Sequence, residues 1–181
     1  TGQTFPESLA AERGRLMDAM VDSHKYNAAG RSVIFGDPEL VYAVTGLCLE
    51  NGIQPVVAAA GSGETALTRL VAENDLWEPV TILAATDFTE IRDQSAARAA
   101  NIAIGPSDGR YLTEREGIPL VRLGFPILDR VGGQRLLSVG YSGTVRLLDR
   151  ITNTLLDAKH REYRGKMYDL YYSGSEREQT G

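Results

Sequence analysis

The amino-acid sequence predicts an α/β fold, a doubly wound parallel sheet of the Rossmann-like or flavodoxin-like kind with about five strands. Two observations carry this prediction. Short apolar runs alternate with longer helical stretches from residue 31 onward, which is typical of βα units and a parallel sheet. Cap and turn residues also stand where the helices should begin and end. A leading helix and a long C-terminal helix complete the expected domain.

The leading helix is predicted over Glu7–His24, where apolar residues recur at helical spacing and charged residues lie mostly off that face. After it, each apolar run is long enough for one buried strand. The runs are Ser32–Phe35, Pro55–Ala59, Val80–Leu83, Ile102–Ile104 and Leu120–Leu123.

The connecting helices carry start signals, because Asp, Ser and Thr cap N-termini and proline suits the first turn. Glycines follow two of the helical stretches, where a left-handed residue ends a helix. The expected starts are Asp37-Pro38, Ser62 or Gly63, Thr86-Asp87 and Ser107-Asp108, and the expected ends are Gly52 and Gly117.

The last helix is predicted over Ser142–His160, with its apolar positions facing the sheet. Beyond Gly165 an aromatic and aliphatic cluster, ending at Tyr172, is expected to lie outside any helix and to cover either this domain's core or a partner chain. We expect residues 1–172 to form one Rossmann-like domain of a larger subunit, and residues 173–181 to be a disordered tail.

Composition excludes several classes of function. The net charge of −5 leaves no basic footprint for nucleic acid. No apolar run approaches the ~20 residues that span a bilayer, and no signal peptide precedes the fold, so we expect no membrane association and a cytoplasmic location. Cys48 is the only cysteine, so the chain cannot form an internal disulfide or a multi-thiolate site.

Ligands of doubly wound sheets bind beyond the carboxyl ends of the strands. Acidic residues at three of the four turns there would repel a pyrophosphate, which disfavours a nucleotide cofactor. We predict no catalytic, cofactor-binding or metal-binding residue in this chain. The candidate partner or cleft contacts are Gly36, Asp37, Ser107, Asp108, Arg122, Gly124, Phe125, Pro126, Asp129 and Arg130.

Arg122 interrupts an apolar strand, so its guanidinium must reach the sheet edge or find a carboxylate. Asp129 and Arg130 are expected to pair with each other or with a neighbouring chain. Two alternatives stay open here. One is a small-molecule binding domain that uses Gly61–Glu64, and the other is a metal module that uses Cys48, His24 and the acidic residues Asp87, Glu90 and Asp93.

Several segments, in the same order along the chain, resemble the C-terminal domain of β-type subunits of the nitrogenase component 1 family. The segment 7–24 is similar to that domain's first helix, and Phe35-Gly36-Asp37-Pro38-Glu39 to its first strand and turn. The segment 118–130, with its Gly124-Phe125-Pro126 step, is similar to the last strand and turn, and Gly140-Tyr141-Ser142-Gly143 to the start of the last helix.

The resemblance implies an architectural domain that pairs with an α-type subunit, with a second copy of the heterodimer and a reductase iron protein as further partners. The parent complex would hold an iron-sulfur cluster and the iron-molybdenum cofactor or its precursor, with none in this fragment. An α-type subunit offers a cofactor-binding histidine after the last strand, whereas this chain has Gly124-Phe125-Pro126. The segments 61–77 and 131–135 favour the cofactor-assembly scaffold subunit NifN over the dinitrogenase β subunit.

Overall fold

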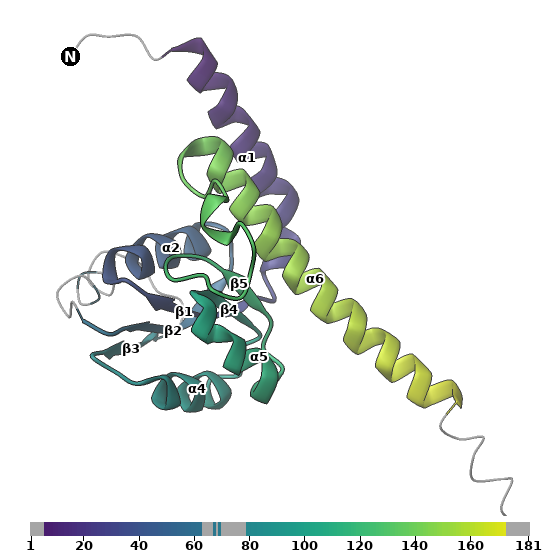
Figure 1. The fold of residues 1–181 in the computed structure, drawn as a ribbon. Coiled ribbons are helices and arrows are strands. Elements are labelled where there is room, and N and C mark those ends of the chain that lie inside the picture. The colour runs from purple at the N-terminus through teal and green to yellow at the C-terminus, as the bar shows by residue number, and fades with distance from the viewer. Residues whose placement is uncertain (1–5, 63–66, 68, 70–78, 173–181) are drawn as a thin grey trace, which may run out of the picture.

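A computed structural model describes residues 6–62, 67, 69 and 79–172. All neighbouring strands in its five-stranded sheet are parallel, and their order is β3-β2-β1-β4-β5. Figure 1 shows helices on both sides of this sheet. The doubly wound fold is therefore confirmed. The strands are β1 (Arg31–Gly36), β2 (Gln54–Ala60), β3 (Thr81–Ala84), β4 (Ile102–Gly105) and β5 (Leu120–Arg122).

Five α-helices and two short 3-10 helices, η1 and η2, connect and flank the strands within the described residues. Asp87 caps its helix as predicted, since its Oδ1 accepts a hydrogen bond from the Glu90 backbone N–H at 3.0 Å. Asp37 occupies the N-cap position of its helix without a side-chain hydrogen bond to it. The helices are α1 (Glu7–Asn27), α2 (Pro38–Glu50), α4 (Phe88–Ala97), η1 (Ser107–Gly109), α5 (Arg110–Glu116), η2 (Gly133–Arg135) and α6 (Gly140–Tyr172).

Two hydrophobic cores lie on opposite faces of the sheet, because successive side chains of a strand point to opposite faces. Ile34 belongs to the core that α2 and α6 cover. Val33 and Phe35, its neighbours on β1, belong to the core that α4 and α5 cover. The central strands are buried along nearly their whole length, which explains why they appear in the sequence as unbroken apolar runs.

The C-terminal helix is longer than predicted. α6 continues through Gly165 to Tyr172, so the expectation that the aromatic cluster lies outside a helix is wrong, and His160 is not near the helix end. A glycine in a helix interior costs only about 1 kcal/mol. Glu162 and Lys166 pair at 2.6 Å one turn apart, and the rings of Tyr168 and Tyr172 stack. These contacts support the helix on both sides of the glycine.

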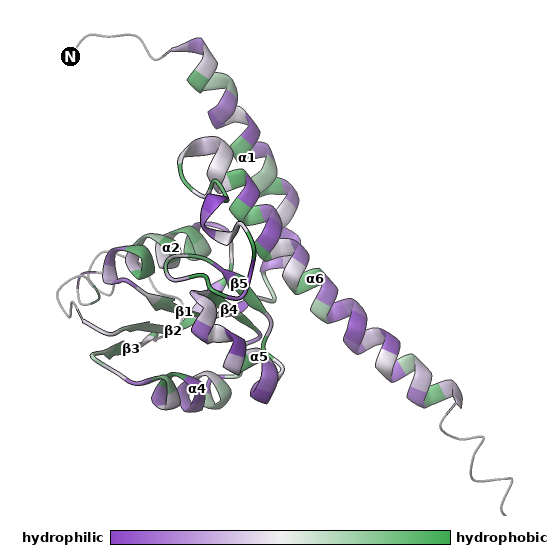
Figure 2. Ribbon diagram, in the orientation of Figure 1, coloured by the Kyte–Doolittle hydropathy of each residue, from purple (hydrophilic) through white to green (hydrophobic). Residues whose placement is uncertain are grey.

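The far end of α6 does not cover this domain's own core. Its aromatic and aliphatic side chains are exposed, and Figure 1 shows this end running away from the sheet. The residues concerned are Tyr163, Tyr168, Leu170, Tyr171 and Tyr172. Figure 2 shows hydrophilic and hydrophobic residues mixed along this end of the helix. Of the two predicted locations for the cluster, the domain's own core is therefore excluded.

The leading helix α1 packs beside α6 rather than on the sheet (Figure 1). Its helical character was predicted correctly, but only Ser23 and Asn27 are buried in it. Met17 and Val21 of the predicted apolar face are exposed. Among the helices of the described residues, none combines the length and apolar content that a bilayer crossing requires.

Candidate functional site

The sheet has its topological switch point between β1 and β4, where the crossover connections leave in opposite directions. The turn after β1 contains Gly36 and Asp37, and the turn after β4 leads through Pro106 into Ser107. The loop after β5 folds back against this second turn, since the Ser107 backbone N–H donates to the Pro126 carbonyl at 3.1 Å. Several predicted contact residues therefore gather at one edge of the sheet.

Ser107 holds the β5 loop in place. Its side chain is only 2% exposed, and its hydroxyl donates to Asp129 Oδ1 at 2.6 Å. The Ser107 hydroxyl oxygen also accepts a hydrogen bond from the Leu128 backbone N–H at 2.8 Å. One hydroxyl thus uses both its donor and an acceptor lone pair on residues about twenty positions away in sequence. This arrangement fixes the backbone of the loop against the turn that follows β4.

Arg122 finds its carboxylate in Asp129. The Arg122 Nε lies 2.8 Å from Oδ1 and 2.9 Å from Oδ2, and Nη2 lies 2.5 Å from Oδ2. Both side chains are more than four-fifths buried. The hydrogen bonds from Arg122 and then from Ser107 hold the pKa of Asp129 well below its usual range. Arg122 was expected either to reach the sheet edge or to find a carboxylate, and the structure shows that it pairs with a carboxylate.

Arg130 contacts Asp129 mainly through the backbone, because its Nη1 donates to the Asp129 carbonyl at 2.6 Å, whereas the two charged groups are 3.8 Å apart. Arg150 of α6 reaches the same region and donates to the Arg122 carbonyl at 2.7 Å. Burial, followed by the charge of Arg122, lowers the pKa of Arg150. α6 is thereby tied to the end of β5.

The loop presents large apolar side chains outward. Phe125 is 72% exposed, Leu128 is 79% exposed and Val131 is fully exposed. Between them, Ile127 is buried, and its carbonyl accepts a hydrogen bond from Gln134 Nε2 at 3.0 Å. The loop is therefore anchored from within while its apolar groups face outward.

Gly124 shows why this turn needs a glycine. Its φ is +83°, a conformation that other residues rarely adopt, and a Cβ there would come within 2.7 Å of Leu40 Cδ2 on α2. Phe125–Pro126 is a cis peptide bond. The positive φ of Gly124 therefore turns the chain just after β5, beside Leu40 of α2.

The structure brings together seven of the ten predicted contact residues: Ser107, Arg122, Gly124, Phe125, Pro126, Asp129 and Arg130. Gly36, Asp37 and Asp108 lie on the two neighbouring turns, where both carboxylates are exposed. Sequence reasoning missed three supporting residues. Leu128, Gln134 and Arg150 have ordinary surface-residue patterns, and only the folded loop brings them to the site.

This group of residues positions a loop and offers no evident catalytic pair. The Ser107 hydroxyl bonds to a carboxylate that is itself held by an arginine, and both histidines lie on helices α1 and α6. Within residues 6–62, 67, 69 and 79–172, no three His, Cys, Asp or Glu side chains come close enough to hold a metal ion. The open alternative at Gly61–Glu64 lies partly outside the described residues.

Cys48 is fully buried on α2. Burial is the main reason why the pKa of its thiol is raised to about 12, and a hydrogen bond with Ser32 offsets part of the effect of burial. We predict that thiol reagents such as 5,5′-dithiobis(2-nitrobenzoate) will not modify Cys48 in the native protein at pH 8 and will modify it in urea. Because this is the only cysteine, the released chromophore reports on one group. Native labelling as fast as in urea would contradict the burial.

The family model described as nitrogenase component 1 type oxidoreductase matches residues 1–156. The chain belongs to this family. A nitrogenase molybdenum-iron protein beta chain from Methanothermobacter thermautotrophicus is 39% identical over 162 residues, covering 87% of this chain and 34% of the relative. A beta chain of the same name from Azotobacter vinelandii is 32% identical over 176 residues, covering 91% and 34%.

The fold of this nitrogenase family member is also found in a solved structure described as nitrogenase Cp1 at pH 6.5. The two share a TM-score of 0.82 and 32% identity, over 90% of this chain and 36% of the other. The chain spans about a third of the length of the curated relatives it matches. The predicted resemblance to β-type subunits is thereby confirmed.

Proposed function

We propose that this chain is an architectural, partner-contacting domain of a NifN-like subunit, which supports assembly of the nitrogenase iron-molybdenum cofactor and performs no chemistry of its own. The anchored β5 loop carries the proposal. Its backbone is held by Ser107, Arg122 and Asp129, while Phe125 and Leu128 stay exposed. A loop whose backbone is already fixed loses little conformational entropy when a partner binds. An exposed apolar surface on such a loop therefore favours a stable subunit contact.

The partner at this loop is proposed to be the α-type subunit. A second copy of the heterodimer and a reductase iron protein would complete a cytoplasmic complex. That complex would hold an iron-sulfur cluster and the iron-molybdenum cofactor or its precursor. The described residues of this chain do not fit such groups, because its one thiol is buried and has a raised pKa, and no metal-ligand set forms among them. Other parts of the complex would supply their ligands.

The dinitrogenase β subunit, which serves electron transfer for dinitrogen reduction, is the second candidate. One observation favours it: the relatives named above are all described as molybdenum-iron protein beta chains. The two candidates differ in their α-type partner. Titrating the chain with the scaffold α-type subunit and, separately, with the dinitrogenase α subunit will decide between them, because the proposed NifN-like role requires tighter binding to the scaffold subunit.

We predict that the double substitution Phe125→Ser with Leu128→Ser weakens binding of the α-type subunit about 30-fold or more, since truncating two central apolar contacts commonly costs 2 kcal/mol or more. Both side chains are exposed in the chain alone, so its melting temperature should change little. Isothermal titration of purified chain with α-type subunit measures the effect.

The matched control is Val21→Ser, which removes an equally exposed apolar side chain that belongs to α1 and not to the loop. It should leave the affinity unchanged. Equal affinity of wild type and the double variant for every α-type subunit would remove the loop from the interface and contradict the proposed function.

A further inference from the structure

The sheet ends at β5, whose outer edge pairs with no other strand among the described residues. On its inner side, the Pro119 carbonyl accepts a hydrogen bond from β4 at 2.8 Å, and the Leu123 N–H donates one to β4 at 2.9 Å. Because successive residues of a strand point their backbone groups to opposite sides, Leu120 and Arg122 direct their N–H and carbonyl groups outward. β5 therefore presents the backbone of two residues at the edge of the sheet.

Only one of these four outward groups has a protein partner in the part of the chain that the structure describes. The Arg122 carbonyl accepts a hydrogen bond from Arg150 Nη2 at 2.7 Å, and a second lone pair of that oxygen stays available. The N–H and carbonyl of Leu120 and the N–H of Arg122 bond to no other described residue. Open N–H and carbonyl groups on an edge strand are a template for pairing with a further strand.

A groove runs along this edge between α5 and α6, which both contact β5 (Figure 1). It has two halves, of about 490 Å³ and about 600 Å³. The halves share the residues Leu120, Arg122, Arg130, Thr154 and Asp157 in their linings. We call this space the β5 groove. Room for an extended segment therefore lies directly beside the open backbone groups of β5.

The larger half of the β5 groove has an excess of positive charge, in a chain whose net charge is −5. Four arginines and three carboxylates line it: Arg110, Arg122, Arg130, Arg161, Glu114, Asp129 and Asp157. Arg122 and Asp129 already neutralise each other. The three other arginines outnumber the two remaining carboxylates, which favours an acidic side chain in this half of the groove.

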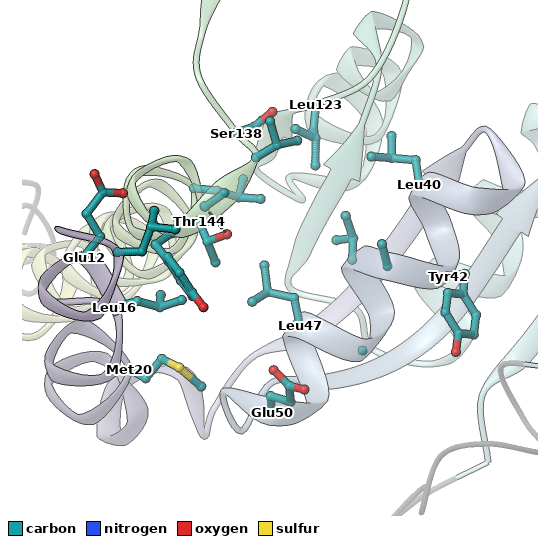
Figure 3. A pocket seen from close by; sticks show the side chains of 18 residues that line it. Glu12, Leu16, Met20, Leu40, Tyr42, Leu47, Glu50, Leu123, Ser138 and Thr144 are labelled. Carbon is teal, nitrogen blue, oxygen red and sulfur yellow. Dashed lines mark hydrogen bonds between the residues drawn. The ribbon is translucent and has the colours of Figure 1, made fainter. Parts of the chain in front are cut away.

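A second groove, of about 860 Å³, opens between α1, α2 and the start of α6 and has the opposite charge. Figure 3 shows Leu16, Met20 and Leu47 pointing into it. Glu12 and Glu50 are the only charged residues in its described lining, so it repels an acidic segment. An acidic extended segment therefore selects the β5 groove.

We propose that the β5 groove binds an extended segment of a partner protein with acidic side chains at alternate positions, and that this segment adds a sixth strand to the sheet. Its backbone would pair with Leu120 and Arg122, which is the general mode of β-strand addition. Side chains of a strand alternate between its two faces, so every second side chain would lie on the α5 side, beside Arg110. The acidic residues would stand at these positions, and the side chains between them would lie against α6.

The strand addition is independent of the proposed subunit role, because it uses neither Phe125 nor Leu128 and is measured on the chain alone. The probe is a fluorescein-labelled synthetic peptide, Thr-Glu-Val-Glu-Val-Glu-Thr, and fluorescence anisotropy of the peptide titrated with the 181-residue chain should show saturable binding. Arg110→Glu with Arg161→Glu should weaken this binding at least about tenfold, since like charges oppose docking.

The matched control is Arg13→Glu with Arg15→Glu, which makes the same change of net charge at two exposed positions on α1. It should leave the affinity for the peptide unchanged. A peptide that does not bind saturably to the wild-type chain, or that the two pairs of reversals weaken equally, would overturn the proposal.

Backbone pairing is tested with two modified peptides, one N-methylated at its three glutamates and the other at its two valines. All glutamate N–H groups of an extended peptide point to one side and all valine N–H groups to the other. One modified peptide should therefore bind as the unmodified one does, and the other at least about tenfold more weakly. Equal affinities of the two would show that charge alone holds the peptide and would contradict strand addition.

Amide hydrogen exchange measured by NMR locates the added strand. The Leu120 N–H has no partner among the described residues, so its exchange should slow at least about tenfold when the peptide saturates the chain. The Leu123 N–H, which already bonds to β4, serves as the control and should change little. An unchanged exchange rate at Leu120 would place the peptide elsewhere and overturn the proposal.

Discussion

Gly105→Ala is expected to destabilise the chain by about 3 kcal/mol or more, because the added methyl has no space to occupy. A Cβ at Gly105 would lie 2.6 Å from the Phe35 carbonyl oxygen and 2.6 Å from Cε2 of its ring. The oxygen belongs to β1, which pairs with β4 at the centre of the sheet. The ring is 4% exposed and packs edge-on against Phe88. Neither group can move without disturbing the core.

Urea denaturation monitored by circular dichroism measures this effect. The control is Gly14→Ala on α1, where a Cβ would meet nothing within 4 Å. That substitution should stabilise the chain by about 0.5–1 kcal/mol, since alanine is the better helix former. A Gly105 variant within 1 kcal/mol of wild type would mean that β1 and β4 are less tightly packed than described.

The strands and most helices could be predicted because their signals are local. Ser32–Phe35 is an apolar run that matches β1 closely, and Asp87 is a helix cap in both sequence and structure. The spatial order of the strands could not be predicted in this way. Nothing in the residues of β4 indicates that it lies beside β1, because that neighbour is set by how the crossover helices pack.

The candidate site shows the same division. The cost of burying an unpaired charge predicted that Arg122 would reach the sheet edge or find a carboxylate, and Asp129 was named as a nearby candidate contact. The contact of Ser107 with Asp129 spans twenty-two residues and depends on the β5 loop folding back. The extension of α6 beyond His160 was missed, because Gly165 and the dense aromatic residues hide the helical period. Ring stacking and an ion pair stabilise this part of the helix.

The anchoring role of Asp129 predicts a pH-dependent difference in stability. At pH 7, Asp129→Asn should lower the free energy of unfolding by about 1.5–3 kcal/mol, the usual worth of hydrogen bonds to a charged group. The pKa of Asp129 is lower in the folded chain than in the unfolded one, so the unfolded state binds more protons as the carboxylate titrates. The contribution of the Asp129 carboxylate to the free energy of unfolding is therefore fully present above about pH 5, and it is lost as the pH falls below about 4.

Denaturation curves of wild type and Asp129→Asn between pH 2.5 and pH 7 should therefore converge as the pH falls. Asp157→Asn, which removes an exposed carboxylate from α6, serves as the control and should follow wild type within about 0.5 kcal/mol throughout. A gap between wild type and Asp129→Asn that stays constant with pH would show that the ionised carboxylate does not hold the loop. The loop would then have to derive its order from Ser107 and from the buried Ile127, and Phe125 and Leu128 would keep their positions in the variant. Binding of the α-type subunit to Asp129→Asn separates these cases, because a loop released from Arg122 should bind more weakly at pH 7.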